Sequence, residues 1–278
     1  MEKAKIYFKL TRPQNNLITV LAVLVGALVS YPIDSFFKLV LACLSAGFIS
    51  AGGYVINDYF DLEIDRINKP DRALPKGELL KKSALNFSLL LFGVGLFLSI
   101  FIKLSSFILA FITFFLLILY SSKLKKTLFF GNLTVSLICA LAFLYGGLVS
   151  SNFILSFIPA SFAYLFHLGR EILKDVEDLK GDRLVDAKTI PIFFGKKIAF
   201  LFITFIFSTL IILTLAPYIF NIFSIFYLLL VILGVDSLML YTIFSMWKNP
   251  SEKNLGRLSR ILKLDMLLGL LAIFIGRF

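Results

Sequence analysis

Residues 57–75 read NDYFDLEIDRINKPDRALP and directly follow an apolar segment long enough to cross a membrane. Asp58, Asp61 and Asp65 lie at offsets 0, 3 and 7, so one stripe of a helix would carry all three carboxylates. Like charges on one stripe repel each other, and more strongly where water is scarce. The dipole at the C-terminal end of a helix adds to this cost. The arrangement therefore requires a compensating cation.

A second acidic motif repeats this spacing further along the chain. Residues 170–195 read REILKDVEDLKGDRLVDAKTIPIFFG, in which Asp175, Asp178 and Asp182 again lie at offsets 0, 3 and 7. Both motifs close with Asp-Arg and are followed within about ten residues by a proline, Pro75 or Pro191. We expect one domain, 1–278, containing a quasi-repeat of about 1–125 and 126–246 plus a ninth helix, 261–277.

The composition is that of a polytopic membrane protein. Of the 278 residues 59% are hydrophobic, and the mean hydropathy is +0.93, whereas soluble domains carry roughly 45–50% apolar residues. A spanning helix needs about 20 mostly apolar residues. We expect an all-α bundle of nine transmembrane helices around a central cavity. The predicted spans are 16–32, 37–57, 84–102, 104–121, 130–150, 153–173, 198–216, 222–246 and 261–277.

The basic residues predict the orientation of these spans. With the N-terminus in the cytoplasm, only Lys38, Lys103 and Arg277 of the 28 lysines and arginines fall outside. This is the positive-inside pattern. We therefore expect a multi-pass protein of the cell membrane with cytoplasmic active-site loops, a cytoplasmic cap formed by the helix 2–3 and 6–7 loops, and the C-terminus outside. Nucleic-acid binding is excluded because the basic residues are spread over membrane loops.

Both acidic motifs fall at cytoplasmic span ends, and their chemistry suits Mg²⁺. Carboxylates and the amide of Asn57 are hard oxygen ligands, and Mg²⁺ commonly takes one or two carboxylates plus substrate phosphates. Two such sets facing each other across a cavity would hold Mg²⁺ ions that bridge a diphosphate. Neighbouring cations such as Arg72 would hold its remaining oxygens.

These motifs resemble the UbiA superfamily of intramembrane prenyltransferases, which have nine transmembrane helices and a lateral opening to lipid. NDxxDxxxD at residues 57–65 and DxxDxxxD at residues 175–182 carry the resemblance, which covers nearly the whole chain. TRPQN (residues 11–15) and YSSKLKK (residues 120–126) are similar to two further elements of the family. The longer segments around both motifs are most similar to the archaeal branch, which makes digeranylgeranylglyceryl phosphate from geranylgeranylglyceryl phosphate and geranylgeranyl diphosphate.

The resemblance implies roles for individual residues. Asp61, Asp65, Asp178 and Asp182 would be catalytic and, with Asn57, would hold Mg²⁺, while Asp58 and Asp175 support the metal site. The predicted diphosphate- or substrate-binding residues are Arg12, Asn15, Arg72, Tyr120, Lys123, Lys125, Lys126 and Lys174.

The implied reaction breaks the C–O bond of an allylic diphosphate and transfers the prenyl group to a lipid-like acceptor, releasing diphosphate. An aromatic-acceptor prenyltransferase of quinone biosynthesis is the main alternative, and assays with both acceptor types would separate the two. A CDP-alcohol phosphotransferase is disfavoured because its DGxxAR-type opening is absent. An ion-coupled transporter would place its acids near the membrane midplane, whereas these lie at span ends.

Three features lie outside the motifs. Asp236 lies deep in the predicted eighth span, where an acid is costly and usually has a partner, so we expect an interhelical hydrogen bond. The sole histidine, His167, is expected to be a polar packing residue. Small residues such as Gly146 and Gly147 permit close approach of helices.

Overall fold

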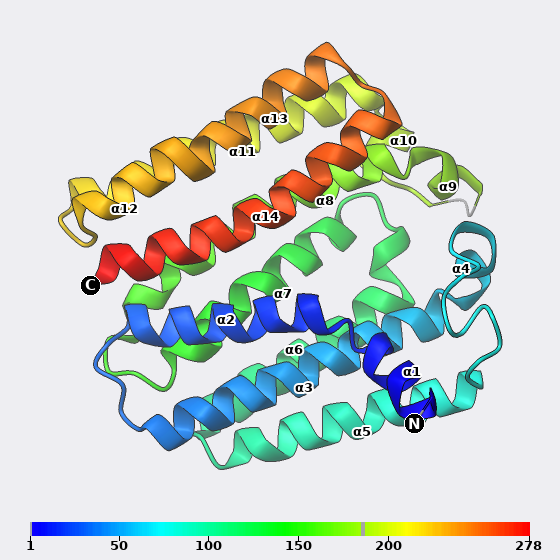
Figure 1. Cartoon of the computed structure of the whole chain (residues 1–278), viewed down its shortest axis with the longest axis horizontal. Coiled ribbons are helices and arrows are strands. Elements are labelled where there is room, and N and C mark those ends of the chain that lie inside the picture. The colour runs from blue at the N-terminus through cyan, green and yellow to red at the C-terminus, as the bar shows by residue number, and fades with distance from the viewer. Residues whose placement is uncertain (1, 185–186) are drawn as a thin grey trace. The chain divides into compact units, whose positions relative to one another are not determined.

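The computed structural model describes residues 2–184 and 187–278, and these residues fold into helices joined by turns (Figure 1). The chain divides into two compact units. The first comprises Met1–Lys125 and Leu141–Ser156, and the second comprises Lys126–Ala140 and Phe157–Phe278.

The first unit is built around the long helix α3. Its elements are α1 (Glu2–Leu10), α2 (Pro13–Val29), α3 (Phe36–Phe60), α4 (Leu62–Asn68), α5 (Lys81–Ile100), α6 (Leu104–Ser122), the start of the 3₁₀ turn η1 (Leu124–Lys126), the end of α7 (Phe130–Gly147) and η2 (Phe153–Ser156). Helices α3 and α5 run side by side (Figure 1), and the Ser45 hydroxyl of α3 donates to the Gly95 carbonyl of α5 at 2.7 Å.

Glycine allows α2 and the end of α7 to touch backbone to backbone. A Cβ on Gly146 would lie 1.9 Å from the carbonyl oxygen of Val23, and a Cβ on Gly26 would lie 2.1 Å from that of Phe143. No larger residue fits such a crossing without moving one of the helices. The prediction that Gly146 permits close helix approach is confirmed.

The second unit contains the start of α7 and the remaining helices. These are α8 (Phe157–Glu177), α9 (Leu179–Leu184), α10 (Ile190–Phe193), α11 (Lys196–Ile219), α12 (Ile225–Leu230), the π-helix η3 (Val231–Asp236), α13 (Ser237–Lys248) and α14 (Glu252–Arg277). In Figure 1, α14 runs beside α8, and α13 beside α11. Their facing sides form one apolar core that includes Ile172, Phe207, Met239 and Leu258.

The apolar helices make this a multi-pass membrane protein. Seven stretches of the described residues are long and apolar enough to cross a bilayer: Phe36–Phe60, Lys81–Ile100, Leu104–Ser122, Phe130–Gly147, Phe153–Glu177, Lys196–Ile219 and Ile225–Lys248. An eighth results if α1 and α2, bent by 53°, form one span. Many large apolar side chains on these helices point outward, as a lipid-facing surface requires: Phe36, Phe205, Leu233 and Phe244 are examples.

Each of the nine predicted spans overlaps a helix, but the edges differ. The segment predicted as 261–277 belongs to α14, which begins at Glu252 because the Ser251 hydroxyl caps it by accepting the N–H of Asn254. This helix is not among the seven stretches because Arg260, Lys263 and Asp265 interrupt its apolar run. The segment predicted as 222–246 is three consecutive elements, α12, η3 and α13.

Candidate active site

The first acidic motif lies where α3 passes into α4. Asp58 belongs to the last turn of α3, Asp61 stands between the two helices, and Asp65 belongs to α4. The N–H of Asp61 donates to the Asn57 carbonyl at 2.9 Å, and the N–H of Asp65 donates to the Asp61 carbonyl at 2.7 Å. Helical hydrogen bonding thus continues through the junction, and it keeps the three carboxylates on the predicted stripe.

All three carboxylates are buried and each is paired with a basic side chain. Asp58, Asp61 and Asp65 are 6%, 6% and 4% exposed. The Arg12 guanidinium donates to Asp58, and the Lys125 ammonium donates to Asp61. Arg72 bridges two acids, donating to Asp65 at 2.6 Å and to Asp58 at 3.2 Å. Three buried acids are thus balanced by three bases whose side chains are 29–36% exposed.

Separate elements bring these three cations to the motif. Arg12 connects α1 to α2 in the left-handed backbone region, with φ of 47°, and its guanidinium lies 5.2 Å from the ring centre of Tyr54. Lys125 belongs to η1, directly after α6. Arg72 lies in the loop between α4 and α5, which is anchored because Leu74 packs with Leu10 in a small apolar cluster.

The structure thus brings Arg12, Arg72 and Lys125 of the predicted basic residues to the first motif. Asn57 also joins it, since its amide N–H donates to Asp61 at 2.8 Å. Asn15 lies in the first turn of α2, where its N–H donates to the Arg12 carbonyl at 2.9 Å.

The second acidic motif repeats the backbone geometry of the first. Asp175 belongs to the last turn of α8, Asp178 stands between α8 and α9, and Asp182 belongs to α9. The N–H of Asp178 donates to the Lys174 carbonyl at 2.8 Å, and the N–H of Asp182 donates to the Asp178 carbonyl at 3.0 Å. In both motifs a span ends just before the second aspartate, and a short helix carries the third.

The side chains of the second motif have different surroundings. Asp175 accepts a hydrogen bond from the Asn132 amide of α7 at 2.8 Å. Asp178 is exposed, and Asp182 is half-buried. The second motif therefore keeps one carboxylate accessible, whereas the first has its carboxylates covered.

A half-buried ion-pair cluster lies next to the second motif on α8. Glu171 accepts from Arg170 at 2.9 Å and from Lys174 at 3.5 Å. Lys174, predicted to bind diphosphate, is therefore paired with a glutamate that the sequence analysis did not single out.

The remaining predicted lysines lie around η1. Lys123 caps α6, and Lys123 and Lys126 are exposed. The Lys126 carbonyl accepts the N–H of Lys188 at 3.0 Å, which ties η1 to the segment before α10. Tyr120 is half-buried in the last turn of α6. Among the predicted lysines, Lys125 donates a hydrogen bond from its ammonium group to an acid of the first motif, Asp61.

The carboxylates do not form a ready metal cage. Within residues 2–184 and 187–278, no group of three acidic, histidine or cysteine side chains converges closely enough to hold a metal ion. The donor chemistry nevertheless fits Mg²⁺, because the first motif offers several buried carboxylate oxygens whose charge the neighbouring bases already balance. A metal ion would have to displace those bases.

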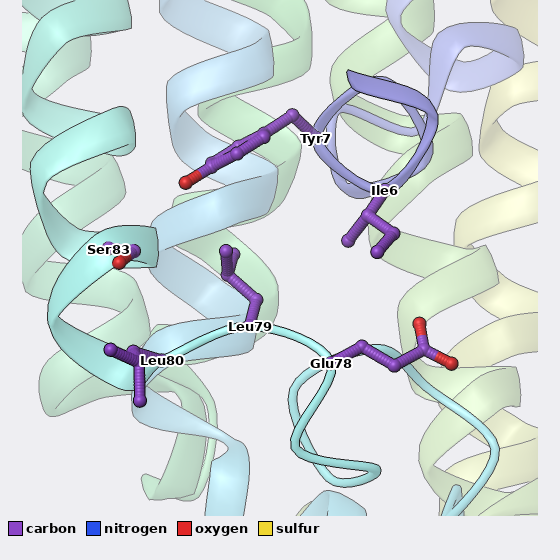
Figure 2. A pocket seen from close by; sticks show the side chains of 6 residues that line it. All are labelled: Ile6, Tyr7, Glu78, Leu79, Leu80 and Ser83. Atoms are coloured by element: carbon purple, nitrogen blue, oxygen red, sulfur yellow. The ribbon is translucent and has the colours of Figure 1, made fainter. Parts of the chain in front are cut away.

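A small pocket of the first unit contains none of the predicted site residues. Figure 2 shows Ile6 and Tyr7 from α1, Glu78, Leu79 and Leu80 from the loop before α5, and Ser83 from α5. The pocket holds about 150 Å³, and beside it the Tyr7 ring meets Phe87 edge-on at 4.8 Å. It is a crevice under the N-terminal helix and far too small for a long prenyl chain.

Three contributors were missed from the sequence: Tyr54, Asn132 and Glu171. Tyr54 precedes Asp58 by four residues, so helical spacing could have placed it on the same face. Asn132 is an amide in the first turn of an apolar span, and Glu171 is an acid within one; each is costly there without a partner.

Comparison with known proteins identifies the family. The model of the UbiA prenyltransferase family matches residues 17–264. Digeranylgeranylglyceryl phosphate synthase of Methanosphaera stadtmanae is 36% identical, with 97% of this chain and 98% of the relative covered. The enzyme of that name from Methanocaldococcus jannaschii is 38% identical, with 99% and 97% covered.

Solved structures agree with this result. A digeranylgeranylglyceryl phosphate synthase structure matches with a TM-score of 0.83 at 38% identity, covering 100% of this chain and 99% of the other. A UbiA homologue from Archaeoglobus fulgidus bound to DMAPP and Mg²⁺ has the same fold, with a TM-score of 0.72 at 22% identity and 96% and 98% covered. The chain therefore belongs to the UbiA prenyltransferase family.

Proposed function

We propose that this protein is a digeranylgeranylglyceryl phosphate synthase. It transfers a geranylgeranyl group from geranylgeranyl diphosphate to the free hydroxyl of geranylgeranylglyceryl phosphate, forming an ether-lipid precursor and releasing diphosphate. The full-length likeness to synthases of this name, at 36–38% identity, carries the proposal. The cluster of acids and bases around Asp58, Asp61 and Asp65 supports it. Its basic side chains suit the oxygens of a diphosphate, and its carboxylates suit the Mg²⁺ that accompanies one.

The charge balance of the first motif suggests how the donor binds. Arg12, Arg72 and Lys125 are already paired with carboxylates, so they cannot neutralise a diphosphate until those acids receive another cation. Asn57, Asp61, Asp65, Asp178 and Asp182, supported by Asp58 and Asp175, would hold Mg²⁺. When bound, the metal supplies Lewis-acid stabilisation of the leaving diphosphate. We propose that donor binding is therefore an exchange of ion pairs.

The reaction then needs charge stabilisation more than acid–base chemistry. The C1–O bond breaks and its electron pair leaves with the diphosphate, while Arg12, Arg72 and Lys125 turn their N–H groups toward the negative charge that develops there. The acceptor oxygen bonds to C1, and its proton passes to a carboxylate or to the released diphosphate. Burial of the motif excludes water that would otherwise quench the allylic cation.

The finer topology also belongs to the proposal. The bundle has nine transmembrane helices around a central cavity, with the N-terminus and the acidic motifs on the cytoplasmic side and the C-terminus outside. The loops after α3 and α8 form a cap in which both motifs act on one diphosphate. The basic loops and the matched local geometry of the motifs support this arrangement.

The test is a matrix of donors and acceptors with the purified protein. Geranylgeranyl diphosphate with geranylgeranylglyceryl phosphate and Mg²⁺ should give the ether product and diphosphate, whereas hydroxybenzoate and dihydroxynaphthoate should not be prenylated. Asp61→Ala and Asp178→Ala should abolish turnover while leaving the protein folded. Prenylation of an aromatic acceptor alone, or full activity in both variants, would contradict the proposal.

A further inference from the structure

Asp265, on α14 of the second unit, is a fully buried acid without a hydrogen-bond partner among the described residues. Its side chain is 0% exposed, and neither carboxyl oxygen has a hydrogen-bond partner. It lies between Leu262 and Met266, which pack into the apolar core of the unit. An ionised carboxylate in such surroundings is very costly, and buried polar groups in folded proteins nearly always have a partner. Asp265 therefore needs a bonding arrangement that supplies a hydrogen or a positive charge.

Asp236, on the element η3 that packs against α14, is the candidate for that arrangement. It is 4% exposed and ends the π-helix η3, an element that often marks a functional position. The contacts between antiparallel helices set the register. Gly234 faces Leu268, and the Arg257 guanidinium donates to the Tyr241 hydroxyl. Counting from these two contacts, residue 265 of α14 lies at the level of residues 233–237.

The neighbouring side chains offer too few hydrogen-bond donors for the carboxyl oxygens of Asp236 and Asp265. The Thr214 hydroxyl of α11 lies 3.2 Å from each carboxyl oxygen of Asp236, but it also donates to the Ile211 carbonyl at 2.7 Å. A hydroxyl has one hydrogen, and the 2.7 Å contact has the usual length of an O–H···O bond. The side chains of Asp236, Asp265 and Thr214 thus have a single hydrogen among them unless a carboxyl is protonated, and that hydrogen is already donated to a backbone carbonyl.

Among the described residues, no basic side chain pairs with Asp236 or Asp265 to balance their charge. Across the described part of the chain, no ion pair is recorded for Asp236 or Asp265, and the nearby Tyr227 hydroxyl donates to the Thr214 carbonyl at 2.8 Å. Two ionised carboxylates would leave two uncompensated charges within the apolar core.

We propose that Asp236 and Asp265 form an intramembrane proton-binding site, in which one proton is shared between the two carboxyl groups. One group is a carboxylic acid that donates to the other, and the second is a carboxylate. The shared proton removes one of the two negative charges and provides the missing hydrogen. The resulting hydrogen bond between the two acids connects η3 to α14 and helps to hold the C-terminal helix against the rest of the unit.

Infrared spectroscopy of the purified full-length protein in lipid nanodiscs tests the proposal. The wild type should show the C=O stretching band of a protonated carboxylic acid at neutral pH. Both Asp265→Asn and Asp236→Asn should lose it, because the remaining acid then accepts from the introduced amide and stays ionised. Asp34→Asn is the control, since Asp34 is exposed and accepts from Ser151 at 2.8 Å; this variant should keep the band.

Other outcomes overturn the proposal. A band that survives both core variants means that the pair holds no proton, and a band lost in only one variant assigns the proton to that acid without sharing. A thermal midpoint raised by sodium chloride, relative to choline chloride at equal ionic strength, in the wild type but not in Asp265→Asn would replace the proton with a metal ion.

Discussion

Replacing Arg72 with alanine isolates the charge balance on which the proposed donor binding depends. Arg72 is the only recorded partner of the Asp65 side chain among the described residues, whereas Asp58 keeps Arg12. The variant therefore leaves one carboxylate, 4% exposed, without a partner. Breaking a buried pair in this way typically costs 3–5 kcal/mol. Because the Arg72 side chain is 29% exposed, we take the lower end, about 3 kcal/mol.

This cost should appear as a thermal shift and as a gain in metal affinity. For a chain of this size, about 3 kcal/mol corresponds to a midpoint lower by roughly 6–12 °C. In the wild type Mg²⁺ must displace Arg72 from Asp65, but in the variant it need not. Mg²⁺ should therefore bind the substrate-free variant more tightly, by at most about 100-fold, and should restore much of the lost stability. Turnover should fall because the diphosphate loses a cation.

Thermal unfolding and Mg²⁺ calorimetry, both without diphosphate, measure these effects. The matched control is Arg66→Ala, because Arg66 pairs with Glu63 at 2.8 Å on the surface, with side chains 57% and 71% exposed. Such surface pairs contribute about 0–1 kcal/mol. If Arg72→Ala matched Arg66→Ala in both stability and Mg²⁺ response, the ion-pair exchange would be refuted.

Three further predictions concern the metal, the second motif and helix packing. Removing divalent ions with EDTA should abolish diphosphate release and Mg²⁺ should restore it; turnover in EDTA would contradict a metal-dependent reaction. Asn132→Leu removes the hydrogen bond to Asp175 and should lower kcat by about tenfold, as loss of an outer-shell partner typically does, without changing the thermal midpoint by more than a few degrees; unchanged kcat would show that the bond is not needed. Gly146→Ala places a methyl group 1.9 Å from a backbone oxygen and should sharply reduce the yield of folded protein, whereas Gly93→Ala, with nothing within 4 Å, should be tolerated; equal yields would contradict the close crossing of α2 and α7.

The sequence was most informative where a pattern repeats. Apolar length predicted the all-helical, membrane-spanning character, and the two 0, 3, 7 acidic motifs indicated the family that the comparisons confirm. The spacing also predicted that Asp58, Asp61 and Asp65 share one face. In the structure the N–H groups of Asp61 and Asp65 keep their helical hydrogen bonds through the α3–α4 junction. Such local geometry depends on a few neighbouring residues and is readable without coordinates.

Partners across the fold were much harder to predict. Nothing in the sequence indicates that Arg12, from another helix end, reaches Asp58, or that Lys125 rather than Lys123 contacts Asp61. Asp236 was expected to bond to another helix, and Thr214 of α11 lies against it. Asp265 was overlooked because it lies in the middle of α14 close to the charged residues Arg260 and Lys263, and only packing reveals that it is buried. Pairings over long sequence separation depend on register, which composition and periodicity do not determine.

A structure with Mn²⁺ in place of Mg²⁺ and an unreactive thio-analogue of geranylgeranyl diphosphate would test the central claim most directly, since anomalous scattering locates the metal. The account predicts metal ions ligated by carboxylates of both motifs, including Asp61 and Asp178, around one diphosphate, with Arg72 and Lys125 moved from their acids to its oxygens. A diphosphate held by one motif alone, or Arg72 and Lys125 still paired with Asp65 and Asp61, would contradict it.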